Sequence, residues 1–113
     1  PFFYTLTPKG ASAFRTLMRR PLPVWDDPIS RSAAAIKFGL LDVTDDADLA
    51  AVAADLKRFY LDSRCGLEAR RESLAADRSF LHCAVGDRIA WADQRIHALD
   101  DLIHDRFHTR VVH

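Results

Sequence analysis

Cysteine and glycine are scarce in this chain of 113 residues. The two cysteines, Cys65 and Cys83, have neither the spacing of a zinc site nor the density of a disulfide-rich fold. Each lies among helix-forming residues, so we expect small buried side chains in a reducing cytoplasm. The four glycines form no phosphate-binding loop.

The chain also lacks an excess of either charge, because sixteen Lys and Arg residues balance sixteen Asp and Glu residues. A protein that neutralises DNA phosphates needs an excess of cations, so this piece alone is not expected to bind nucleic acid strongly. No long uncharged apolar run occurs, so the sequence predicts no membrane span. Hydrophobic residues nevertheless make up 49% of the chain, which is enough for the core of one domain.

One strand pattern is present, at the start of the chain. Between Pro1 and Thr7, aromatic and β-branched side chains alternate with a period of two, which indicates a β-strand. A lone strand cannot satisfy its own backbone hydrogen-bonding groups. We therefore expect the rest of its sheet to lie upstream of Pro1.

Four helices are predicted after this strand, and the first two are short. Thr7 followed by Pro8 is an N-cap signal, and the first helix is expected to end at Arg20. Residues 21–28 hold three prolines and predict a stiff, extended connector. A second cap at Asp27 begins the next helix, whose apolar stripe is formed by Ile29, Ala33, Ile36 and Leu40.

The last two helices are long. Thr44 is predicted to cap the third helix, because acidic residues follow it in the first turn, and the apolar pattern continues to about residues 75–79. Gly66 lies inside this helix, where we expect a local bend or a close packing contact. A heptad pattern predicts the fourth helix from about Ser79 to Phe107. The short turn between the two long helices predicts an antiparallel hairpin.

Each long helix carries more apolar surface than a contact between two helices can bury. Left exposed, such a surface favours aggregation, so the sequence predicts a second copy packed about a two-fold axis, completing a helical bundle. The alternative is that the first two helices cover this surface. The predicted dimer interface consists of Leu49, Val52, Leu56, Phe59, Val85, Ile89, Ala92, Ile96, Leu99 and Ile103.

Three segments carry a resemblance to a known family. They are residues 3–14 (FYTLTPKGASAF), 34–42 (AAIKFGLLD) and 85–99 (VGDRIAWADQRIHAL). The first resembles the last wing strand, with the helix after it, of the PadR family of winged-helix transcriptional regulators. The other two resemble the C-terminal region of that family and its final helix. An acidic residue expected shortly before the final-helix tryptophan is replaced here by Ile89 and Ala90.

The resemblance implies a mainly α chain in three parts. Residues 1–20 would hold the end of the wing and a connecting helix, residues 21–28 a connector, and residues 29–113 a helical dimerisation and effector region. PadR-like proteins are homodimeric, cytoplasmic, usually repressors and not enzymes. They bind operator DNA through a winged-helix domain, most of which would precede Pro1, and no cofactor is implied.

The roles of several residues have two possible interpretations. Lys9 is either a contact to the DNA backbone or an ordinary solvated lysine. Trp25 and Trp91 either line a cavity for a small aromatic effector or belong to the core. The chain as a whole could also be a helical protein–protein interaction module with no link to DNA.

A metal-binding helical bundle is a further alternative. Histidine and carboxylate side chains spaced one helical turn apart can ligate zinc or iron. The third predicted helix offers no matching set of ligands, so we favour a solvated polar face and expect no metal. The residues concerned are His97, Asp101, His104, Asp105 and His108.

Overall fold

The computed structural model describes residues 7–108, with the side chain of His108 left out. Its helices are α1 (Pro8–Arg19), α2 (Pro28–Gly39), α3 (Asp46–Glu72) and α4 (Ser79–Ile103). A 3-10 turn (Leu41–Val43) precedes α3, and a π-helical turn (His104–His108) follows α4. The mainly helical class and the order of four helices are therefore confirmed.

The predicted strand lies outside the described residues, except for Thr7, which caps α1. No strand occurs between residues 7 and 108.

Two of the predicted helix starts depend on side-chain caps that the structure confirms. The Gly10 N–H donates to Thr7 Oγ1 at 3.0 Å, and the Ser30 N–H donates to Asp27 Oδ2 at 3.0 Å. Such caps satisfy backbone donors that have no partner inside the helix. The third predicted cap is wrong, because the Thr44 hydroxyl donates to the Leu40 carbonyl and holds the 3-10 turn.

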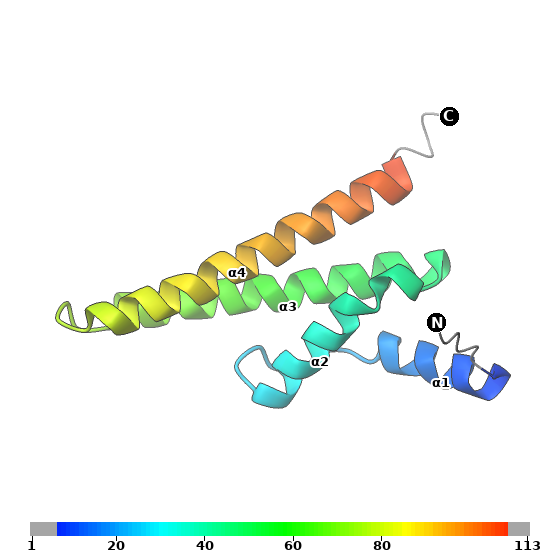
Figure 1. Cartoon of the computed structure of the whole chain (residues 1–113), viewed down its shortest axis with the longest axis horizontal. Coiled ribbons are helices and arrows are strands. Elements are labelled where there is room, and N and C mark those ends of the chain that lie inside the picture. Colours follow the sequence, from blue (N-terminus) through cyan, green and yellow to red (C-terminus); the bar gives the residue numbers. More distant parts are fainter. Residues whose placement is uncertain (1–6, 109–113) are drawn as a thin grey trace, which may run out of the picture.

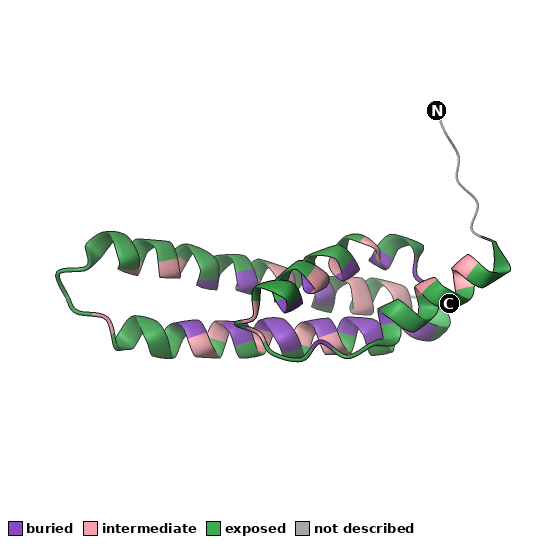
Figure 2. Ribbon diagram, turned by 90° about the horizontal axis from the view of Figure 1, so that it is seen from below, coloured by how far each residue is buried: buried purple, intermediate pink, exposed green. Residues whose placement is uncertain are grey.

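The predicted antiparallel hairpin is formed by α3 and α4 (Figure 1). In the same view α2 lies against the middle of the hairpin, and α1 lies near the beginning of α3. Figure 2 shows buried residues gathered where α2 crosses the hairpin, while the part next to the α3–α4 turn is mostly exposed. The core residues of α3 and α4 are Leu49, Val52, Ala53, Leu56, Phe59, Tyr60, Leu67, Ile89, Ala92, Ile96 and Leu99.

The apolar stripe predicted for α2 is divided: Ala33 and Leu40 pack against the core, but the two isoleucines face outward. The side chains that it buries are Ser30, Ala34 and Lys37, whereas Ile29 and Ile36 are 79% and 59% exposed. The inner polar groups have partners: the Ser30 hydroxyl donates to Asp27 Oδ2, and Lys37 Nζ donates to the Arg20 carbonyl. The orientation is tolerated because these polar groups remain hydrogen-bonded when buried.

The connector between α1 and α2 is fixed onto α3. Leu22 is buried, its N–H donates to Asp55 Oδ2 at 3.0 Å, and its carbonyl accepts from Arg58 Nη2 at 2.6 Å. Farther along, the indole of Trp25 packs directly on Gly66 of α3. The close contact predicted at Gly66 is thus confirmed, and the bonds of Leu22 together with the packing of Trp25 hold the connector against α3.

The expected burial of the two cysteines is wrong. Cys65 and Cys83 are both exposed free thiols on the outer faces of α3 and α4. Sequence context predicted helices at both positions correctly, but it did not indicate which face of each helix the thiols occupy.

Candidate functional site

The predicted dimer interface lies largely inside the single chain. Eight of its ten residues are buried between α3, α4 and their neighbours, and only Val85 and Ile103 are half-buried. Leu56 and Leu99, for example, are 0% and 1% exposed. The surface that remains for a second copy is therefore formed by other side chains.

Large exposed apolar side chains are spread over α1, α2, α4 and the segments between α1 and α3 in the described chain, and they include Leu17, Val24 and Val43. Ile29 and Ile36 occupy the outer stripe of α2, seven residues apart and hence on one helical face. Phe80, which is 91% exposed, and Leu81 lie at the beginning of α4, next to the hairpin turn. Trp91, near the middle of α4, is half-exposed. The outer stripe of α2 lies on a short helix whose opposite face is already buried, so a partner on this stripe would give α2 buried contacts on both sides.

The two tryptophans contact different residues of α3. Trp25 packs on Gly66, and the Arg70 guanidinium lies 4.8 Å from its ring centroid. Trp91 makes an edge-on contact with Tyr60, with ring centroids 5.6 Å apart. They line no common cavity in the described part of the chain, and a cavity between two copies stays a prediction.

Trp91 belongs to an aromatic and cationic cluster between α2, α3 and α4. The guanidinium of Arg95 lies 4.0 Å from the ring centroid of Phe38 and 4.7 Å from that of Trp91, so it is held by two cation–π contacts. Tyr60 is buried beside them, and its hydroxyl has no hydrogen-bond partner among the described residues. Burial raises the pKa of Tyr60, and the positive charge of Arg95 opposes this shift.

A small cavity of about 60 Å³ adjoins this cluster. Arg31 of α2 and Arg88 of α4 lie on it, together with Tyr60 and Trp91. Burial lowers the pKa of Arg88, and the charges of Arg31 and Arg70 lower it further. The cavity is too small for an aromatic effector, because its volume corresponds to about two water molecules.

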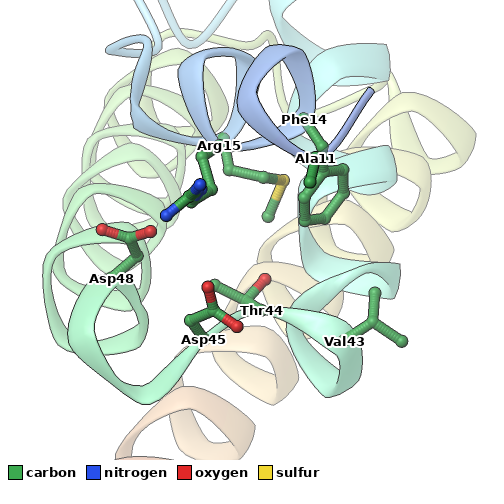
Figure 3. Close-up of a pocket in the computed structure, with 8 residues that line it drawn as sticks. Ala11, Phe14, Arg15, Val43, Thr44, Asp45 and Asp48 are labelled. Carbon is green, nitrogen blue, oxygen red and sulfur yellow. The ribbon is translucent and has the colours of Figure 1, made fainter. Parts of the chain in front are cut away.

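A larger cavity of about 220 Å³ separates α1 from the beginning of α3 (Figure 3). Its apolar wall comes from α1 and the 3-10 turn, and its polar groups come from α1, the two residues before α3 and the first turn of α3. Beside it, Arg19 Nε donates to the buried carboxylate of Asp48 at 2.7 Å, which joins α1 to α3. The lining residues are Ala11, Phe14, Arg15, Met18, Val43, Thr44, Asp45 and Asp48.

The remaining predicted positions lie on the surface. Lys9 is exposed in the first turn of α1. His97, Asp101 and His104 are exposed at the end of α4 and the turn after it, and no group of three metal-ligating side chains forms among the residues that the structure describes. No described helix is long and apolar enough to cross a membrane.

Comparison with known proteins gives no relative for this chain. No family model, curated protein or solved structure matches it.

Sequence reasoning missed the cavity beside α1 and the buried Lys37. Arg15 and Asp45 are thirty residues apart, and neither belongs to a recognisable motif. The sequence carries no signal for this cavity, because only the structure shows that Asp45, at the N-cap of α3, makes no capping bond with its side chain. An aspartate that does not cap its helix is free to face a cavity.

Proposed function

We propose that the chain is the C-terminal dimerisation and effector-sensing region of a PadR-like transcriptional regulator. In this proposal two copies of the chain form a dimer. The dimer holds two winged-helix domains, one from each copy and each largely upstream of Pro1, at a fixed separation. The separation of the two domains then selects the spacing of half-sites on operator DNA.

The observation that supports the proposal most directly is the outer stripe of α2, formed by Ile29 and Ile36. A surface helix normally buries its apolar face and exposes its polar face. Here Ser30 and Lys37 face the core, while Ile29 and Ile36 face outward. A second copy that covers Ile29 and Ile36 would give α2 buried contacts on both faces, as expected for a helix at a dimer interface.

The attachment of α1 supports a role as connecting helix. Arg19 pairs with Asp48 of α3, and the buried Lys37 of α2 bonds the Arg20 carbonyl just after α1. The end of α1 is thus bound to both α2 and α3. A domain attached before Pro8 would follow the orientation of this helix, and so would its position on DNA.

A fusion experiment tests dimerisation in a DNA-binding context. The chain is joined after a DNA-binding domain that occupies its operator only as a dimer. We expect the fusion to restore operator binding, and we expect Ile29→Glu to abolish it because a carboxylate would be buried in the interface. Ala35→Glu, which adds the same charge at another exposed position of α2, should retain binding.

The link to the PadR family has a separate test, the residues that precede Pro1 in the natural gene product. A winged helix there supports the proposal, and its absence contradicts it. Without a winged helix, the same α2 stripe favours a protein–protein interaction module that contacts another protein's helix.

A further inference from the structure

The cavity between α1 and α3 contains opposite charges that do not pair with each other. Within residues 7–107, the side chains of Arg15 and Asp45 make no ion pair and no hydrogen bond. Figure 3 shows Arg15 extending from α1, with Asp45 and Asp48 across the opening from it. Asp48 is already paired with Arg19, so the solvent-exposed side chains of Arg15 and Asp45 leave one unpaired cation and one unpaired anion at the edge of the cavity.

The rest of the cavity lining is mainly apolar, apart from Thr44 and the paired Asp48, and the cavity has a limited size. Ala11, Phe14, Met18 and Val43 form its wall. A volume of about 220 Å³ accommodates roughly seven water-sized groups. The described cavity therefore suits a compact ligand with a short apolar part, both charges and no net charge.

We propose that this cavity binds a free α-amino acid with an apolar side chain of about the size of valine. The ligand's carboxylate pairs with Arg15, its ammonium group pairs with Asp45, and its side chain lies against Phe14. Each charged group of the protein then gains the partner that it lacks, and the apolar wall is covered.

The bound amino acid would join α1 to the beginning of α3. Arg15 lies on α1, whereas Asp45 directly precedes α3, so a ligand that contacts both restricts their relative motion. The inference depends on the cavity alone and does not require a DNA-binding domain. If such a domain precedes α1, binding would favour one orientation of it.

Titration of the 113-residue chain with L-valine, followed by amide chemical shifts in NMR spectra, tests the proposal. We expect saturable shifts centred on α1 and the first turn of α3. Three related compounds each lack one recognised feature: valinamide lacks the carboxylate, 3-methylbutanoate lacks the ammonium group and glycine lacks the side chain. Each should bind at least about tenfold more weakly, since a lost charge-assisted contact or apolar contact has an effect of that order.

Two variants locate the site. Arg15→Gln and Asp45→Asn should each weaken valine binding by about tenfold or more. Arg78→Gln and Asp77→Asn make the same changes in the exposed α3–α4 turn and should leave binding unchanged. The proposal is overturned if valine causes no saturable shifts, if the three analogues bind as well as valine, or if the cavity variants bind like the wild type. Circular dichroism of each variant verifies that the helices are retained.

Discussion

Replacing Gly66 by alanine should destabilise the protein, although alanine is the better helix former. A methyl group at Gly66 would overlap with Cζ2, Cε2 and Cη2 of the Trp25 ring, the last at 2.7 Å. The indole must therefore leave its position on α3. Trp25 is half-buried, and an aromatic side chain buries about 150–250 Å² when fully covered. About half of that area, at about 25 cal/mol per Å², corresponds to about 2–3 kcal/mol.

Two smaller contributions complete the estimate. Displacing Trp25 also removes the cation–π contact with Arg70, which at an exposed site contributes about 0.5–1 kcal/mol. Alanine in place of glycine inside a helix stabilises by about 0.5–1 kcal/mol. The net expectation for Gly66→Ala is a loss of about 1.5–3.5 kcal/mol in the free energy of unfolding.

A double-mutant cycle isolates the cause. Urea unfolding is followed by circular dichroism for the wild type, Gly66→Ala, Trp25→Ala and the double variant. In the Trp25→Ala background the obstructing ring is absent, so Gly66→Ala should stabilise by about 0.5–1 kcal/mol. The effect of one substitution thus changes sign with the residue at position 25. Stabilisation by Gly66→Ala in the wild-type background would refute the packing of Trp25 on α3.

Three further predictions concern the core. Leu99→Ala should lower the free energy of unfolding by about 2–5 kcal/mol in urea denaturation. Phe80→Ala, at a 91% exposed position, should change it by less than about 0.5 kcal/mol. Equal effects of the two substitutions would contradict the described burial. Tyr60→Phe should stabilise by up to about 1–3 kcal/mol, because it removes a buried hydroxyl without a described partner. Folding raises the pKa of Tyr60, so the folded state retains its proton more strongly, and the stability of the wild type should fall as the pH rises above about 10. The Tyr60→Phe variant should lose this part of the alkaline decline in stability. An unchanged decline in the variant would contradict the burial of Tyr60. Asp55→Ala should leave the buried Leu22 N–H without its partner, which should lower the free energy of unfolding by about 1–3 kcal/mol and speed hydrogen exchange at that amide. Unchanged exchange would show that Asp55 does not hold the connector.

Local signals in the sequence predicted much of the fold. The caps at Thr7 and Asp27 act within three residues of themselves, so their helices follow directly from the sequence. The heptad pattern of α4 predicted both a long helix and the buried side of it, because Ile89 and Ile96 recur at the spacing of one helical face.

The orientation of α2 could not be predicted in this way. An apolar stripe such as that of Ile29 and Ile36 requires cover, but it does not specify whether the cover belongs to the same chain. The hydrogen bond from Lys37 to the Arg20 carbonyl, which helps to hold the opposite face inward, joins residues seventeen positions apart. Similarly, Arg15 and Asp45 come together only because α1 docks against α3.

The molecular mass in solution is the most direct test of the central claim, that a second copy covers the outer stripe of α2. Sedimentation equilibrium of the 113-residue chain should give twice the chain mass of 12.8 kDa. A variant with Ile29→Glu and Ile36→Glu should sediment as a monomer with unchanged helicity, while Ala35→Glu should remain dimeric. A wild-type mass of 12.8 kDa at every concentration, or a dimer unaffected by both glutamates, would contradict the account.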